Sequence, residues 1–395
     1  MEFKRTIYGS LQNDLNSKKI TILFGARQVG KSYLLKKLEK ENKKKRKSKY
    51  FNLEKPEDLA LFNKSDAEII QILEESGDLI SIDEFHYVKN ASHIFKAIYD
   101  TNPSIKIYAS GSSAIEMHKH IKESLVGRFK EYQIKPLNYE EFLSNSTNLK
   151  LNDYLCYGAL PGLYDQEECP KNSDKEEYLR LIVATYIQKD IKSLIKEENI
   201  SAFNHLIFIL AEFQGQIVVT SNLANDLNVS SKTVEKYLSI LEQTFVIYKL
   251  NSFSNNLSNE LKKSKKYYFY DQGIRNALIK DFRKVNSRID KGCIWETFVY
   301  HHLLAVREAA NTDIFFWRTT KGSEIDFIWF CNREITAIEV KSKLKKPAIP
   351  DNMKEFLRKY PHTKELIVFN ENINEETEYK GYPLRFISFD NILEF

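Results

Sequence analysis

Short apolar runs alternate with amphipathic stretches throughout residues 1–145. Between the runs, for example at 32–41 and 92–101, apolar residues recur three or four positions apart, as they do on one face of a helix. Alternating strands and helices predict an α/β domain with a parallel sheet, because right-handed crossovers stack the helices on the sheet. The expected strands are Ile20–Phe24, Lys49–Leu53, Leu79–Ile82, Ile105–Ala109 and Glu131–Leu137.

A polar, turn-prone segment at 144–152 separates this region from a helical one that continues to about residue 250. The last part of the helical region contains a short helix pattern, a polar turn at 228–230, an amphipathic helix and an apolar strand. This order is typical of a winged helix-turn-helix. Strand patterns return at 267–270, 314–317, 325–330, 336–340 and 366–369. We therefore expect three domains, at 1–145, 153–255 and 256–395.

Composition and charge narrow the class of protein. The 395 residues include 42% hydrophobic side chains, and 59 Lys and Arg nearly balance 54 Asp and Glu, which leaves a formal net charge of +5. This composition is that of a globular protein, and so small a charge does not by itself indicate nucleic acid binding. The four cysteines lie far apart and lack Cys-x-x-Cys spacing, so neither a disulfide framework nor a zinc site is expected. Without a membrane-length apolar run or a signal-peptide pattern, we expect a cytoplasmic protein with no membrane partner.

The most specific motif has the form G-x-x-x-x-G-K-[ST] and lies between an apolar strand and an amphipathic helix. Its residues are Gly25, Ala26, Arg27, Gln28, Val29, Gly30, Lys31 and Ser32. The two glycines let backbone N–H groups and the helix N-terminus face a polyphosphate. We expect Lys31 to neutralise the β- and γ-phosphates of ATP and Ser32 to supply one ligand to Mg²⁺.

Three further segments contain side chains suited to ATP hydrolysis. The strand at 79–82 is followed by Asp83, predicted for the Mg²⁺ shell, and Glu84, predicted to act on the attacking water. Ser110 follows the next strand, and its hydroxyl is expected to sense the γ-phosphate, with a helix cap as the alternative. Arg128 is a candidate arginine finger, in cis or from another subunit of a homo-oligomer, with a surface ion pair as the alternative.

These motifs, in this order, resemble a family of prokaryotic AAA-like P-loop ATPases that carry a C-terminal domain of uncertain function. The resemblance rests on GARQVGKS, YFNLEKPEDLALF, LISIDEFH, IKIYASGSSA and ESLVGRF, and on YGALPGLY and YIQKDI in the helical region. It covers nearly the whole chain. It implies that Lys31, Ser32, Asp83 and Glu84 form the nucleotide and Mg²⁺ site. The strand that ends at Ser110 here often ends in Thr-Gly-Ser in that family.

Acidic and basic residues lie on neighbouring strands of the last predicted domain. Glu339 and Lys341 alternate along one strand and face the same side, and Asp326 on the preceding strand can approach them. Two carboxylates can hold Mg²⁺ on a scissile phosphate while the ammonium assists the attacking water. This arrangement resembles the PD-(D/E)xK nuclease core, and Glu296 on a predicted helix matches an acid often found there. Inactive binding domains share the pattern, so cleavage and binding both stay open.

The predicted recognition helix begins with polar residues that are expected to face DNA, or else to cap the helix. They are Ser230, Ser231, Lys232, Thr233, Lys236 and Tyr237. The whole pattern favours an ATP hydrolase that acts on or near DNA through winged-helix and nuclease-like domains. The alternative is a signalling or scaffold ATPase whose C-terminal domain binds protein without catalysis. A kinase of a small metabolite fits less well, because Glu84 and the large C-terminal region have no role in that chemistry.

Overall fold

The computed structural model describes residues 3–112, 125–144, 149–165, 169–186, 200–254, 265–310 and 312–395. The chain forms two compact units, of which the first comprises Met1–Leu137, Leu160–Glu168 and Ser239–Val246. The second comprises Asn138–Ala159, Cys169–Leu238 and Ile247–Phe395. All four cysteines are free thiols, as expected. Across the described ranges, no helix has the length and apolar character needed to cross a membrane.

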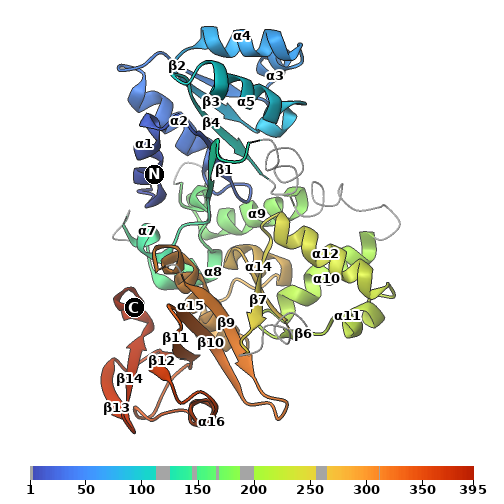
Figure 1. The fold of residues 1–395 in the computed structure, drawn as a ribbon. Coiled ribbons are helices and arrows are strands. Elements are labelled where there is room, and N and C mark those ends of the chain that lie inside the picture. The colour runs from blue at the N-terminus through green and yellow to red at the C-terminus, as the bar shows by residue number, and fades with distance from the viewer. Residues whose placement is uncertain are drawn as a thin grey trace. The chain divides into compact units, whose positions relative to one another are not determined.

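A five-stranded parallel sheet forms the first unit, as predicted, in the strand order β2-β3-β4-β1-β5 (Figure 1). The strands are β1 (Ile20–Phe24), β2 (Ser48–Asn52), β3 (Leu79–Asp83), β4 (Lys106–Gly111) and β5 (Phe129–Gln133). The last strand begins and ends earlier than its predicted range, because its pairing with β1 runs only from Phe129 to Gln133. The three central strands are buried on both faces, which explains their nearly continuous apolar sequences.

The helices of this unit are α1 (Ile7–Asn13), α2 (Lys31–Asn42), α3 (Pro56–Phe62), α4 (Asp66–Ser76) and α5 (Ala91–Thr101). Of these, α2 and α5 match the predicted ranges. The sequence analysis did not predict α3 and α4, although both have local start signals. Pro56 occupies the first turn of α3, and Ser65 forms a capping box with Glu68 at the start of α4.

The second unit contains the predicted helical region. Its helices are α7 (Tyr139–Leu143), α8 (Leu151–Tyr157), α9 (Asn172–Ile182), α10 (Ile200–Glu212), α11 (Thr220–Asp226), α12 (Ser231–Gln243), α14 (Gln272–Ile279), α15 (Lys291–Ala310) and α16 (Asp351–Lys359). The residues of α12 from Ser239 onward belong to the first unit. Part of the YIQKDI segment and part of the polar segment at 144–152 lie outside the described residues.

A mixed nine-stranded sheet completes the second unit, in the order β13-β14-β12-β11-β10-β9-β7-β8-β6. The strands are β6 (Ile217–Val218), β7 (Ile247–Ser252), β8 (Lys265–Phe269), β9 (Asp313–Arg318), β10 (Glu324–Cys331), β11 (Glu334–Val340), β12 (Thr363–Asn370), β13 (Glu375–Tyr379) and β14 (Tyr382–Ser388). The sheet joins strands from both sides of the predicted boundary at residue 255, because β7 pairs with β9. The division into three domains stays a prediction.

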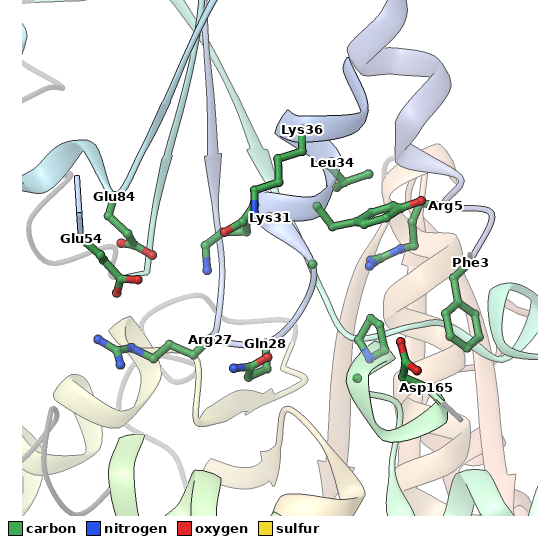
Figure 2. Close-up of a pocket in the computed structure, with 15 residues that line it drawn as sticks. Phe3, Arg5, Arg27, Gln28, Lys31, Leu34, Lys36, Glu54, Glu84 and Asp165 are labelled. Atoms are coloured by element: carbon green, nitrogen blue, oxygen red, sulfur yellow. The ribbon is translucent and has the colours of Figure 1, made fainter. Parts of the chain in front are cut away.

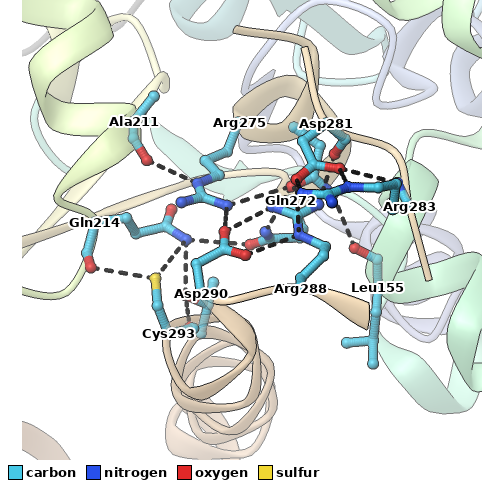
Figure 3. Close-up of polar contacts among 12 residues, drawn as sticks. Leu155, Ala211, Gln214, Gln272, Arg275, Asp281, Arg283, Arg288, Asp290 and Cys293 are labelled. Atoms are coloured by element: carbon cyan, nitrogen blue, oxygen red, sulfur yellow. Dashed lines mark hydrogen bonds and ion pairs between the residues drawn. The ribbon is translucent and has the colours of Figure 1, made fainter. Parts of the chain in front are cut away.

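A buried polar network lies among α10, α14 and α15 (Figure 3). Arg275, only 1% exposed, donates from Nε to the Ala211 carbonyl oxygen at 2.7 Å and pairs with Asp290. Arg288 donates to the same carboxylate at 2.6 Å. Burial alone would raise the pKa of Asp290, but hydrogen bonds from Arg288 and Arg275 hold that pKa well below its usual range. The carboxylate is therefore ionised and shared by two guanidinium groups.

Candidate nucleotide-binding site

The loop between β1 and α2 has a backbone that requires its two glycines. Gly25 has φ +153° and Gly30 has φ +95°, both outside the range that other residues adopt easily. A Cβ atom on Gly25 would lie 2.1 Å from the Ile134 carbonyl oxygen, which is closer than any tolerated contact. Gly30 is the N-cap of α2, so the loop leads directly into the helix N-terminus. The loop therefore has the shape that its sequence motif predicts.

Lys31 occupies the interior of this loop. The residue is 5% exposed, and its ammonium donates to the carbonyl oxygens of Gly25 and Ala26, both at 2.8 Å. Burial lowers the pKa of Lys31 to about 8, although the charges of Glu84 and Asp83 act in the opposite direction. Lys31 is thus a buried cation. Two loop carbonyls accept hydrogen bonds from its ammonium, and the carboxylates of Glu84 and Asp83 attract it.

Asp83 ends β3, and two hydroxyl groups orient its carboxylate. The Ser110 hydroxyl on the neighbouring strand β4 donates to Oδ1 of Asp83, and the Tyr50 hydroxyl on β2 donates to Oδ2 at 2.7 Å. Burial and the bond to Asp83 raise the pKa of Tyr50. Ser110 therefore lies at the strand end where it was expected, but in the structure it contacts Asp83. Its predicted role as a γ-phosphate sensor stays a prediction.

Glu84 follows Asp83 and adopts the left-handed backbone conformation, with φ +56°. Non-glycine residues in this conformation are uncommon and concentrate at functional sites. One carboxylate oxygen of Glu84 lies 3.1 Å from Nδ1 of His86. Burial acts to raise the pKa of Glu84, but the His86 hydrogen bond and the charge of Lys31 outweigh it and lower that pKa. Glu84 is therefore an ionised carboxylate near neutral pH.

Of the side chains described so far, Lys31 and Glu84 line one pocket of about 620 Å³ (Figure 2). It is lined by Phe3, Arg5, Arg27, Gln28, Gly30, Lys31, Ser32, Tyr33, Leu34, Lys36, Glu54, Glu84, Pro161, Gly162 and Asp165. Figure 2 shows Lys31 between two groups, with Glu84 and Glu54 on one side and Phe3, Arg5 and Asp165 on the other. The volume lies in the range typical of small-molecule sites.

Arg128 lies away from this pocket. It precedes β5, and its carbonyl oxygen accepts from the Ile20 amide at 3.0 Å, at the amino end of β1. The loop with Lys31 follows the carboxyl end of the same strand, about 16 Å away for a strand of this length. The Arg128 side chain pairs with Asp100, with Nε 3.0 Å from Oδ1. Arg128 therefore forms a surface ion pair in this structure. Its role as an arginine finger toward another subunit stays a prediction.

The C-terminal candidates come together on adjacent elements of the second unit. Glu339 on β11 forms an ion pair with Lys341, which directly follows that strand, and the Val340 amide donates to Oδ2 of Asp326 on β10 at 2.8 Å. Burial raises the pKa of Asp326 well above its ordinary value, and the charges of Glu339 and Glu296 add to the effect. Burial also raises the pKa of Glu339, against the opposing charge of Lys341. The cluster thus favours retention of a proton near neutral pH.

Lys266 on β8 is a member of this cluster that the sequence analysis missed. It is 2% exposed, and its ammonium lies 3.0 Å from Oε1 of Glu296 and 2.6 Å from Oε1 of Glu324. The Tyr268 hydroxyl also donates to Glu296, at 2.6 Å. Among the described residues, no three His, Cys, Asp or Glu side chains are arranged to hold a metal ion. Lys266 thus forms ion pairs with two acidic side chains at this cluster, and a metal-binding or nuclease role for its residues stays a prediction.

The predicted recognition helix corresponds to the first residues of α12. The Ser230 hydroxyl accepts from the Thr233 amide at 3.1 Å and so caps the helix, while Ser231, Lys232 and Lys236 are exposed. The prediction for Tyr237 was wrong. This residue is 2% exposed and packs edge-on against Phe203, with ring centroids 5.3 Å apart, because its position falls on the apolar face of the helix.

Comparison with known protein families agrees with this geometry. Residues 17–143 match the family model described as an AAA domain. The part of the chain that carries the P-loop motif is thus similar to AAA-type P-loop domains. Residues 148–285 match a domain of unknown function (DUF8612), and residues 291–387 match another (DUF4143). The segment that matches the AAA model contains the P-loop, Asp83, Glu84, Ser110 and Arg128.

Full-length comparisons find related but uncharacterized proteins. One from Mycobacterium tuberculosis is 24% identical over 90% of this chain and 77% of its own length. Another from Haemophilus influenzae is 27% identical over 69% of this chain and 67% of its own. Among solved structures, AMPPCP-bound DnaA from Aquifex aeolicus is 19% identical, with a TM-score of 0.31 over 60% of this chain and 87% of that one. So low a TM-score adds nothing to the description of the fold.

Several residues that shape this pocket or contact its acidic pair were not selected from the sequence. Tyr50 and His86 contact the acidic pair, and Arg5 donates to the carbonyl oxygens of Val29 at 2.8 Å and Lys135 at 2.6 Å. For Tyr50 a signal existed, because parallel pairing places it beside Ser81 and directs it toward the end of β3. The sequence has no comparable signal for Arg5, whose role depends on the path of the N-terminal segment.

Proposed function

We propose that this protein binds ATP with Mg²⁺ and hydrolyses it at the P-loop of its AAA domain. The observation that carries the proposal is the presence of Lys31, Ser32 and Glu84 in the walls of one pocket. Asp83 directly precedes Glu84 at the end of β3, and the Ser110 hydroxyl donates to its carboxylate. A cationic loop and helix N-terminus bind phosphates, and an acidic pair at the end of another strand of the same sheet, β3, suits hydrolysis.

The residues that would hold Mg²⁺ fit this ion. Mg²⁺ usually binds through one or two protein oxygens together with substrate phosphates and water. The Ser32 hydroxyl and the Asp83 carboxylate supply such oxygens, and Ser110 and Tyr50 hold the carboxylate in one orientation. When bound, the ion would neutralise charge on the β- and γ-phosphates.

Lys31 and Glu84 would perform the steps that belong to the protein. The Lys31 ammonium exchanges its bonds to the Gly25 and Ala26 carbonyls for bonds to the phosphate oxygens of ATP. The ionised carboxylate of Glu84 accepts a hydrogen bond from the attacking water and orients it. His86 holds that carboxylate from the side, which limits the conformations Glu84 can adopt.

Replacing Glu84 with Gln tests the hydrolytic part of this proposal. E84Q keeps the shape of the side chain but removes the base, so ATP should still bind while steady-state turnover falls by about 100- to 10,000-fold. Phosphate release and nucleotide binding should be measured on the same preparation. E54Q is the matched control, because Glu54 is also a carboxylate in the pocket wall, and it should keep most of the turnover. Wild-type turnover by E84Q would refute the assignment of Glu84.

A second proposed function is DNA binding by the second unit without cleavage. The helices α10, α11 and α12 and the strands β6, β7 and β8 follow one another in the order of a winged helix, and β8 pairs antiparallel with both other strands. Lys232 and Lys236 are exposed on α12. Lys266 neutralises the acidic cluster, which favours a non-catalytic C-terminal domain. The same observation suits the alternative, a scaffold whose C-terminal domain binds protein.

Salt-dependent DNA binding separates these two possibilities. If α12 contacts phosphates, replacing both Lys232 and Lys236 with Ala should weaken binding and lower the slope of log K against log salt by about 2. The matched control replaces two other exposed lysines, Lys364 and Lys380. Equal slopes for both double variants, or no binding by the wild type, would favour the protein-binding scaffold. Metal-dependent cutting that D326A abolishes would contradict the non-catalytic assignment.

A further inference from the structure

We propose that a pocket at the amino ends of β1 and β4 binds a phosphate group of a nucleic-acid backbone. The pocket has a volume of about 250 Å³, and its lining belongs to the first unit. This lining includes the cationic side chains of Lys18, Arg46 and Lys106, together with Ser17 and Ser104. Among the described residues, no Asp or Glu lines it. The pocket therefore offers hydrogen-bond donors and positive charge to an anion.

The topology of the sheet separates this pocket from the P-loop. Ser17 and Lys18 precede β1, Ser104 precedes β4, and the two strands are parallel neighbours. Their amino ends therefore meet at one edge of the sheet, whereas the P-loop follows the carboxyl end of β1. Because β1 has 5 residues, the two edges lie about 16 Å apart. A ligand in this pocket thus does not occupy the space of a nucleotide at Lys31.

Lys106 is the buried cation of this pocket. It is 2% exposed, and its ammonium donates to the Lys19 carbonyl oxygen and, at 2.8 Å, to the Thr21 hydroxyl. Both acceptors are neutral. Burial lowers the pKa of Lys106 to about 8, although the charge of Asp14 acts in the opposite direction, and Asp14 itself pairs with Lys130. An anion in the pocket would therefore stabilise the charged form of Lys106.

Arg46 and Lys18 also keep their positive charge available to a ligand. The Arg46 guanidinium donates to the Leu15 carbonyl oxygen and to Oδ1 of Asn16, both at 3.0 Å, and these neutral oxygens orient its plane. The exposed Lys18 ammonium lies over the Tyr99 ring, 4.9 Å from the centroid. A guanidinium held in one orientation, together with ammonium groups, suits the oxygens of a phosphate.

A run of basic residues next to the pocket indicates which phosphate it takes. Six of the seven residues 43–49 are Lys or Arg, and Arg46 is the member of this run that lines the pocket. Residues 43–45 and Lys47 are exposed. A free phosphate ion would occupy the pocket alone, whereas a nucleic-acid backbone carries a further phosphate at every nucleotide. The basic run therefore favours a nucleic acid, with one phosphate in the pocket and its neighbours along residues 43–47.

Salt-dependent binding of duplex DNA to the full chain tests this inference. K18Q/R46Q removes two charges from the pocket but keeps polar side chains there. The slope of log K against log salt should fall by about 2, and the affinity by about tenfold or more. The matched control is K64Q/K96Q, which removes two exposed charges of the same unit outside the pocket lining and should change neither value. Wild-type binding by K18Q/R46Q, or no DNA binding by the wild type, would overturn the inference.

Two further comparisons identify the source of the phosphate. K43Q/K44Q/K45Q leaves the pocket lining intact and should also lower the slope, by about one for each lysine that contacts a phosphate. If this variant binds DNA as the wild type does, while K18Q/R46Q weakens the binding of inorganic phosphate in calorimetry, the ligand is a free phosphate and the nucleic-acid assignment is wrong. DNA binding that depends on Lys232 and Lys236 but not on Lys18 and Arg46 would also overturn the inference. Circular dichroism should confirm that each variant is folded.

Discussion

At the scale of single residues, the nucleotide site depends on side chains that neighbouring strands bring together. Lys31 is buried in its loop, and Asp83 receives hydroxyl groups from Ser110 and Tyr50. The motif residues were predictable because their spacing along the chain is fixed by the phosphate-binding loop. Tyr50 was predictable only once the parallel pairing of β2 with β3 is known, and His86 was not predictable, because its contact depends on the left-handed turn at Glu84.

The depressed pKa of Lys31 predicts that ATP binding weakens at high pH. Because burial lowers this pKa to about 8, the unbound ammonium loses its proton as the pH rises through that value, and binding then requires proton uptake. The apparent dissociation constant should therefore be about tenfold higher at pH 9 than at pH 7. Calorimetry in buffers with different ionisation enthalpies would measure both the affinity and the proton uptake. A constant affinity from pH 7 to 9, without proton uptake, would contradict this prediction.

At the scale of elements, hydrophobic pattern predicted the strands that are buried on both faces and missed those at the edge of the second sheet. Ile22, Ile80 and Ile107 are nearly inaccessible, so β1, β3 and β4 have apolar runs that stand out in the sequence. The edge strand β13, Glu375–Tyr379, is exposed and acidic, as suits an edge that must not pair with another chain. Such a strand has no apolar signal, and only its pairing with β14 defines it.

The clustering of Glu296, Asp326, Glu339 and Lys341 was predictable in part. Alternation along β11 placed Glu339 and Lys341 on one side, and hairpin pairing with β10 added Asp326. The position of Lys266 was not predictable, because β8 reaches the cluster only through the nine-stranded order of the sheet. That buried ammonium adds two ion pairs, to Glu296 and Glu324, which the sequence did not predict.

The polar network among α10, α14 and α15 predicts a large effect on stability. R275M should lower the free energy of unfolding by about 1–3 kcal/mol, because it removes the donor to the Ala211 carbonyl and one of the two guanidinium partners of Asp290. Urea denaturation of purified variants would measure this difference. R283M is the matched control, since Arg283 pairs with Asp281 at the exposed edge of the same network, and its effect should be small. Similar losses of unfolding free energy for R275M and R283M would contradict the prediction that the buried guanidinium contributes more to stability than the exposed one.

At the scale of the whole molecule, the chain passes between the two units beside the nucleotide pocket. Asn138–Ala159 belongs to the second unit, and Leu160–Glu168 belongs to the first, where Pro161, Gly162 and Asp165 line the pocket. The Ala159 amide donates to Asp271 at 2.6 Å, and that carboxylate also caps α14 by accepting from the Ile274 amide. Pro161 of the pocket wall therefore follows, by two residues, an alanine whose amide is hydrogen-bonded within the second unit.

Binding of ATP by the P-loop is the central claim, and one titration tests it most directly. ATP with Mg²⁺ should be titrated into the wild-type chain and into K31A, with the fold of both checked by circular dichroism. The wild type should bind ATP, and K31A should bind about 100-fold more weakly, because a charge-assisted contact to phosphate is lost. Equal affinities for the two proteins, or no binding by the wild type at millimolar ATP, would contradict the account.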